Sequence, residues 1–401
     1  MLVNKSYEIL SCDDYELNVK RNSKLEYRIS FDDERQMKAV VFIAGGFGAN
    51  ANVSFLDFDR QYLAKKFDVV VVDVFYHCFC ARKSIDEKYN PKLVTNSSDL
   101  KEFNEFLKLL GEDFCVNENN FFEALDFVDK RLEILKNEGR ADKAFKFNAK
   151  CDFVPPNGDY QNYGIMAALD FINALKDIMK KFPNFKTLPK IYGGGSYGGY
   201  LAFLIAKIAP FYVDCVVDNS GVVFPYMSHL LGRDVGAEFV FYGKNYDIFC
   251  FLKRLWNANN LSKENYIIRT ILNTSHLQIQ AKANADTIFI SYHSSKDLAA
   301  PADDKIKLYE LLKELGFFGI LHLVKDENDV DKRFIKSLEH GLRMSDKALL
   351  KKELPFILER LKDKKIDLGG GEQNFIVYPC GEKNFIFYDD KELYKLRIEK
   401  S

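Results

Sequence analysis

A glycine-rich segment carries the clearest sign of chemistry in this sequence. Gly194, Ser196 and Gly198 follow the pattern G-x-S-x-G, with Tyr197 directly after the serine and Gly199 closing the run. When such a segment joins a strand to a helix, the sharp turn exposes the serine hydroxyl, and the glycines remove Cβ clashes between the two elements. A phosphate-binding Walker loop would need a Lys-Ser/Thr pair, which this segment lacks. We therefore predict Ser196 as a nucleophile, with Gly194, Gly198 and Gly199 providing clearance.

A serine nucleophile needs an acid that orients its base. Enzymes with this turn carry the three groups in the chain order Ser, Asp/Glu, His. Asp297 follows an apolar strand expected at 287–292 and precedes a helix expected from 302. Asp303 and Asp304 compete, but they fall at the start of that helix, where carboxylates stabilise the helix dipole. Asp297 is the predicted acid.

The base must be a histidine that can take the serine proton. His340 lies in a segment beyond the last expected core strand, where a loop can bring the ring over the serine. His322 alternates with leucines and is expected to be a packed core residue. His77 remains a candidate pocket residue. The other histidines lie before or beside the acid and are His229, His276 and His293.

Backbone amides are expected to stabilise the oxyanion that forms when the serine attacks a carbonyl. The amide of Tyr197 opens the helix after the serine and is one predicted donor. A second donor is expected from the loop after the third strand, 44–48, where Gly46 or Phe47 brings an amide close. A plain glycine turn is the alternative for this loop.

The elements that must position these groups alternate regularly between strands and helices. Unbroken apolar runs such as 68–75 are typical of strands buried on both faces of a parallel sheet. We predict an α/β fold with a mainly parallel, doubly wound sheet covered by helices on both faces. Strands are expected at 6–12, 25–31, 38–43, 68–75, 189–193, 213–218, 287–292 and 320–324, and helices at 53–66, from 163 to about 181, 197–208, 302–315 and 346–363.

Two long segments interrupt this alternation. The first, about 77–160, is charged and has a helical pattern with little strand signal, and we expect it to lie over one edge of the sheet. The second, 222–284, is rich in Phe, Tyr and Asn. The α/β domain is thus predicted to span 1–365 with both insertions, and 366–401 to form a glycine-containing linker and a β-hairpin at 373–391.

Composition narrows the class of partner. The 401 residues are 47% hydrophobic and include 57 Lys+Arg and 58 Asp+Glu, which gives a net charge of −1. This balance leaves no positively charged field that would attract nucleic acid or an anionic membrane. The eight cysteines lack framework spacing, so reduced thiols and a cytoplasmic location are expected, without membrane span or leader. Cys78 and Cys80 beside His77 form only a weak zinc signal. No cofactor or metal is predicted.

Gly194 to Tyr200, followed by Leu201-Ala202, resembles the corresponding turn of the prolyl-oligopeptidase and esterase branch of the α/β-hydrolase superfamily. The resemblance covers about 36–75, 160–221 and 286–363, and it implies a catalytic triad of Ser196, Asp297 and His340. Ala44 stands where that branch often has a histidine, and the peptidases' propeller has no counterpart. The insertions resemble nothing specific.

The whole chain also resembles a hydrolase-like family of flagellated epsilon-proteobacteria, some of whose genes lie near surface-glycan genes; the segment 163–166 fits that family. Together these features predict a serine esterase whose substrate is a small-molecule or glycan acyl ester, including a carbohydrate O-acyl ester. An acyltransferase sharing the same residues, or a binding protein with this fold, are the alternatives. The oligomeric state does not follow from the sequence.

Overall fold

The computed structural model describes residues 1–47, 52–82, 84–231, 233, 236–257, 259–364, 374–390 and 393–401. Its centre is an eight-stranded sheet with the order β1-β2-β4-β3-β7-β8-β11-β12. Every neighbouring pair from β4 to β12 is parallel, whereas β1 and β2 are antiparallel at one edge. The strands are β1 (Leu2–Leu10), β2 (Lys24–Asp32), β3 (Val40–Ile43), β4 (Val70–Phe75), β7 (Lys190–Gly195), β8 (Cys215–Asn219), β11 (Ile288–Ser294) and β12 (Phe318–Val324).

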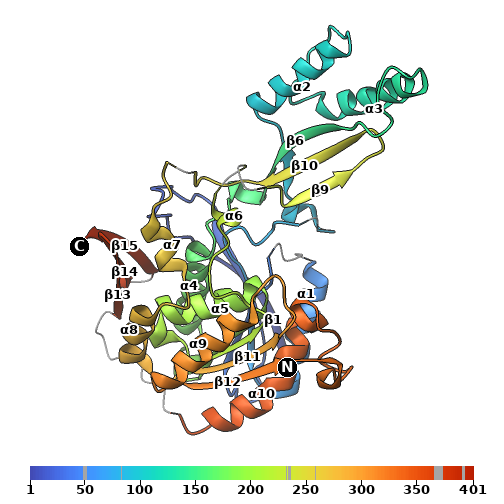
Figure 1. The fold of residues 1–401 in the computed structure, drawn as a ribbon. Coiled ribbons are helices and arrows are strands. Elements are labelled where there is room, and N and C mark those ends of the chain that lie inside the picture. Colours follow the sequence, from blue (N-terminus) through green and yellow to red (C-terminus); the bar gives the residue numbers. More distant parts are fainter. Residues whose placement is uncertain are drawn as a thin grey trace.

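Helices cover both faces of this sheet (Figure 1). The central strands are rich in β-branched residues, and their side chains are buried on both faces, so each face needs an apolar cover. One cover is formed by α4 (Ile165–Lys181), α5 (Tyr197–Ile208), α8 (Thr274–Asn284) and α9 (Ala302–Glu314), and the other by α1 (Val53–Phe67) and α10 (Asp346–Leu361). This is the α/β-hydrolase fold expected from the sequence.

The two insertions share a second, four-stranded sheet with the order β5-β6-β10-β9. It stands away from the central sheet in Figure 1, with α2 (Ser97–Leu109) and α3 (Phe121–Asn137) beside it. The first insertion contributes β5 (Lys92–Val94) and β6 (Phe147–Val154), and the second contributes β9 (Phe239–Tyr242) and β10 (Tyr246–Leu252). The first insertion does contain helices, as expected, but the expectation of little strand structure there was wrong, because β6 pairs with β10 of the distant second insertion.

β6 and β10 pair in parallel, and Ala149, Cys151, Ile248 and Cys250 point toward one buried cluster under the helices. The second insertion also contains three helices. α6 (Met227–Leu230) precedes β9, and α7 (Lys263–Arg269) and then α8 follow β10. The two insertions therefore build one shared small core rather than separate covers of a sheet edge.

The C-terminal segment forms an antiparallel sheet of β13 (Phe375–Cys380), β14 (Lys383–Asp390) and β15 (Leu393–Lys400). The first two strands are the predicted hairpin, and β15 is a third strand that the sequence did not indicate. Tyr378 and Tyr394 donate hydrogen bonds to the last carbonyls of α5, at Lys207 and Ile208. The predicted linker with its glycines at 369–371 lies outside the described residues.

In the described part of the chain, we find no helix that combines the length and the apolarity needed to span a membrane.

Candidate active site

Ser196 lies at the turn between β7 and α5, where the sequence placed it. Its backbone has φ 56° and ψ −121°, a strained conformation for a residue with a side chain. Gly194 and Gly198 are required there, because a Cβ on either residue would overlap the carbonyl oxygen of Ala44. A Cβ on Gly199 would overlap the carboxylate of Asp218. All three predicted glycines therefore make the close passage of strand and helix sterically feasible.

The structure brings Ser196, His340 and Asp297 together in one chain of hydrogen bonds. Nε2 of His340 lies 2.8 Å from Oγ of Ser196, and Nδ1 lies 2.8 Å and 3.0 Å from the two carboxylate oxygens of Asp297. In this geometry the ring can accept the serine proton at Nε2 while the carboxylate stabilises the proton on Nδ1. The arrangement is chemically suited to nucleophilic attack by a serine.

Asp297 is built to remain ionised although it is buried. Its Oδ1 accepts hydrogen bonds from the amides of Ala299 and Ala300, at 2.9 Å and 2.8 Å. Burial acts to raise the pKa of Asp297, but the hydrogen bonds from His340 and the Ala300 amide outweigh it, so the pKa is lowered. The acid loop thus supplies a fixed negative charge beneath the histidine.

Asn219 and Ser220, at the end of β8, connect the serine turn with the histidine loop. The amide of Ser196 donates to the carbonyl of Asn219 at 2.7 Å, and Nδ2 of Asn219 donates to the carbonyl of Gly341 at 2.8 Å. Oγ of Ser220 accepts from the amide of Gly341 at 3.1 Å. The sequence analysis missed both residues; polar residues ending an apolar buried strand are the signal that could have found them.

The histidine loop itself needs such support. Gly341, Leu342 and Arg343 all have positive φ, between 48° and 76°, and two of them carry side chains. Nδ2 of Asn219 also donates to the carbonyl of Met344 at 3.2 Å, so its amide spans the strained segment. We conclude that Asn219 fixes the position of the His340 loop relative to Ser196.

Asp346, in the first turn of α10, supports the other side of the serine turn and was also missed. Its Oδ1 accepts a hydrogen bond from the amide of Gly195 at 2.8 Å. Burial raises the pKa of Asp346 to about 7, the Gly195 amide opposes this rise, and the carboxylates of Asp73 and Asp59 reinforce it. The sequence gives no functional signal for Asp346, because acidic residues are common in the first turn of helices.

The predicted oxyanion donors lie beside the serine. Tyr197 is the first residue of α5, and the first amides of a helix have no preceding helical carbonyl to bond. A Cβ on Gly46 would lie 3.4 Å from the carbonyl oxygen of Gly195, so this loop packs against the turn. The Phe47 ring contacts the Tyr197 ring edge-on, with 5.8 Å between centroids. Gly48 lies outside the described residues, and the donor role of Gly46 or Phe47 stays a prediction.

The competing side chains take no part in the hydrogen bonds that join Ser196, His340 and Asp297, although Nε2 of His293 lies 3.9 Å from Oδ2 of Asp297. Asp303 and Asp304 are in the first turn of α9. His276 bonds the carbonyl of Pro379 through Nε2. His322 is half-buried and stacked on Tyr292. Nε2 of His293 bonds the carbonyl of Ala300, and His77 is buried beside Asp159. The side chain of His229 lies outside the described part of the structure.

Within the described residues, no group of three or more metal-binding side chains occurs, and Cys78 is a buried thiol.

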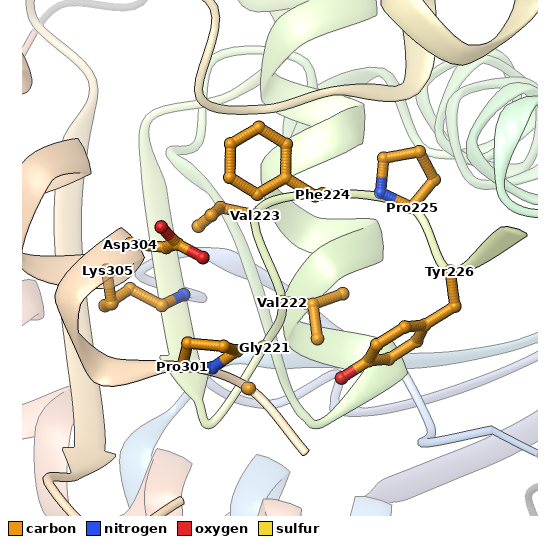
Figure 2. Close-up of a pocket in the computed structure, with 10 residues that line it drawn as sticks. Gly221, Val222, Val223, Phe224, Pro225, Tyr226, Pro301, Asp304 and Lys305 are labelled. Carbon is orange, nitrogen blue, oxygen red and sulfur yellow. The ribbon is translucent and has the colours of Figure 1, made fainter. Parts of the chain in front are cut away.

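A pocket of about 170 Å³ lies between the loop after Asp297 and the segment that follows Ser220 (Figure 2). Ala300, which donates to Asp297, and Gly221, which follows Ser220, both line it. Tyr226 and Asp304 add polar groups to otherwise mainly apolar walls. The other apolar wall residues are Val222, Val223, Phe224, Pro225 and Pro301.

Residues 5–398 match the family described as "Protein of unknown function (DUF2920)". The chain belongs to the DUF2920 family. The match covers nearly the whole chain, so both insertions and the C-terminal sheet are within the family's extent. No curated protein matches this member of DUF2920.

Solved structures similar to this DUF2920 protein include a Pyrococcus horikoshii acylaminoacyl peptidase, with 14% identity, a TM-score of 0.46, and coverage of 92% of this chain and 43% of that one. A ferulic acid esterase has 11% identity, a TM-score of 0.42, and coverage of 89% and 98%. Thermogutta terrifontis esterase 2 has 12% identity, a TM-score of 0.40, and coverage of 89% and 93%. The chain spans less than half of the peptidase, and the epsilon-proteobacterial resemblance stays a prediction.

Proposed function

We propose that this DUF2920 protein is a serine hydrolase that cleaves acyl esters through a catalytic triad of Ser196, His340 and Asp297. The observation that carries the proposal is the continuous hydrogen-bonded chain from Oγ of Ser196 through both ring nitrogens of His340 to the carboxylate of Asp297. The strained backbone of Ser196 adds support, because such strain is typical of functional sites.

In the proposed reaction, Oγ of Ser196 attacks the ester carbonyl while Nε2 of His340 takes its proton. The tetrahedral oxyanion is stabilised by the Tyr197 amide and by an amide of the loop holding Gly46 and Phe47. His340 then protonates the departing alcohol, leaving an acyl-serine. Water, deprotonated by the same ring, attacks this ester and releases the acid, and the proton returns to Ser196.

An acyl-enzyme predicts a specific kinetic behaviour. Mixing the purified protein with a short p-nitrophenyl ester should give a rapid burst of nitrophenol, up to one equivalent per chain, followed by steady turnover. Ser196→Ala should show neither phase, while circular dichroism reports an intact fold. If the variant keeps the wild-type rate, Ser196 is not the nucleophile and the proposal fails.

A carbohydrate O-acyl ester is the substrate we would screen next, by following acetate release from acetylated sugars. Transfer to an added sugar hydroxyl, in place of water, would appear as an acylated acceptor detected by mass spectrometry. Both reactions use the same acyl-enzyme, and only the second acceptor differs.

A further inference from the structure

The pocket that Ala300 lines beside Asp297 also contains a carboxylate without an ion-pair partner among the described residues. Asp304 lines it, and no hydrogen bond or ion pair to its carboxylate occurs within the described part of the chain. The neighbouring Lys305 does not neutralise this charge, because its Nζ lies 2.7 Å from the buried carboxylate of Asp218 and is itself buried. A cation entering the pocket would therefore meet a free carboxylate.

The remaining walls suit an organic cation rather than a hydrated metal ion. Figure 2 shows Asp304 and the ring of Tyr226 on opposite sides of the pocket, with Val222 and Val223 lining the space between them. Phe224 adds a second aromatic ring. Aromatic faces attract ammonium groups, and apolar walls bind their carbon substituents while weakening solvent screening of the carboxylate.

We propose that this pocket selects ester substrates that carry an ammonium group, and that Asp304 is the residue that determines this specificity. The inference rests on the proposed esterase function. Selection arises because Asp304 pairs with the ammonium group, while Tyr226 packs against its carbon substituents and chain. An isosteric substrate with a methyl group in place of the ammonium gains only the apolar contacts.

The size of the pocket limits the group that it holds. Its volume of about 170 Å³ is close to the roughly 150 Å³ of an engineered cavity that takes up benzene. A chain of about six heavy atoms or a compact trimethylammonium group would fill such a space. The group can belong either to the acyl part or to the alcohol part of the ester, and the experiment separates these two sources.

Two pairs of esters test the inference. In the first pair, p-nitrophenyl 6-aminohexanoate and p-nitrophenyl heptanoate differ only in the end of the acyl chain. In the second, acetylcholine and 3,3-dimethylbutyl acetate differ only in the alcohol. We expect kcat/KM to be about tenfold higher for the charged member of one pair, as one partly exposed ion pair with aromatic contacts would give. The responding pair identifies which part of the ester occupies the pocket.

Asp304→Asn should reduce this ratio to near one. The matched control is Asp303→Asn, because Asp303 is an exposed carboxylate in the same first turn of α9 and does not line the pocket. The control variant should retain the wild-type ratio, which separates a pocket effect from loss of a helix-dipole contact. Ratios near one for both pairs in the wild type, or an unchanged ratio in Asp304→Asn, would overturn the inference.

The two proposals fail in different ways. A wild type that cleaves the neutral esters without preference contradicts only the role of Asp304. A wild type that cleaves none of the four esters contradicts the esterase proposal, and the pocket is then tested by calorimetric titration with butyltrimethylammonium. Binding that weakens about tenfold in Asp304→Asn, but not in Asp303→Asn, supports the ammonium site, and equal binding by all three proteins refutes it.

Discussion

The central eight-stranded sheet and the four-stranded sheet of the insertions are assembled in different ways. In the central sheet, Ser196, Asp297 and His340 come directly after or shortly beyond β7, β11 and β12, so parallel strands bring them to one edge. In the sheet of the insertions, Cys151 of β6 and Cys250 of β10 are direct partners although 99 residues separate them. The chemistry therefore depends on short local segments of the core, whereas the insertions depend on long-range pairing.

This contrast suggests a division of roles, in which the core carries out the reaction and the insertions affect what reaches it. The hypothesis is motivated by the hydrogen bonds of Ser196, His340 and Asp297, which are all formed with core residues. Changes in the core should therefore reduce turnover strongly, and changes in the second sheet should leave the chemical step nearly unaffected.

The largest effect is expected for His340→Ala. Without a base, the serine proton has no acceptor, and kcat/KM for a p-nitrophenyl ester should fall by about 10⁵-fold. His322→Ala is the control, because this half-buried histidine stacks on Tyr292 away from the serine. A fall in His340→Ala no greater than that of the control would remove His340 from the mechanism.

Asn219→Ala should have the next largest effect. The variant loses the amide that spans the histidine loop, so the base is misplaced, and kcat should fall about 100-fold with little change in KM. Asn284→Ala is a matched control, because Asn284 also donates its amide to two carbonyls, those of Pro210 and Val213, which lie beyond the end of α5 opposite to Ser196. Both variants should lose stability, but only Asn219→Ala should lose kcat. Equal kcat values would assign Asn219 a purely structural role.

Asp346→Asn tests the pH dependence of the core. The folded-state pKa of Asp346 is about 7, above its ordinary value of 3.8, so the folded state binds more protons between these pH values. Stability should thus decline as the pH rises through this window, because the ionised carboxylate is disfavoured in the fold. The variant avoids this cost, and since the site is part-buried we expect it to gain about 1 kcal/mol relative to wild type at pH 8.

The measurement is the urea midpoint of Asp346→Asn and wild type at pH 4.5 and pH 8. The urea midpoint of Asp346→Asn, relative to that of the wild type, should be higher at pH 8 than at pH 4.5. Asp303→Asn, another helix-start carboxylate, should show no such pH-dependent change. If Asp346→Asn and Asp303→Asn respond alike, the raised pKa is not a property of the folded site.

The smallest effect on turnover is expected for Arg233→Met. Arg233 belongs to the second insertion and pairs with Asp99 and Asp152 of the first, so its loss should loosen the shared sheet. Hydrogen exchange should accelerate in β6 and β10 while β7 and β8 remain protected, and kcat/KM for p-nitrophenyl acetate should change by no more than about twofold. A tenfold loss would show that the insertions take part in the chemical step.

Much of the core was predictable because its signals are local. The helix expected at 197–208 has those bounds in the structure, and the helix expected from 302 begins there, since apolar periodicity and turn residues mark both elements. That Ser196, Asp297 and His340 lie together was predictable from chain order and from their places after strands, and their catalytic roles stay a prediction.

The unpredicted parts depend on contacts that no short segment reveals. β6 does alternate apolar or small residues with polar ones, but this short signal was overlooked within a charged segment, and its partner β10 lies about 100 residues further along the chain. β15 is likewise stabilised by β14 and by the burial of Tyr394 against the core. Asn219 acts through the carbonyls of a loop more than 100 residues away, so its role depends entirely on the tertiary fold.

The central claim is tested most directly by intact mass spectrometry after reaction with a fluorophosphonate. We predict one adduct per chain, mapped by peptide fragmentation to Ser196, in the wild type, and no adduct in Ser196→Ala under the same conditions. Prior heat denaturation should abolish labelling of the wild type, because an activated serine requires the folded triad. A folded wild type that remains unlabelled, or an adduct that persists in Ser196→Ala, would contradict the account.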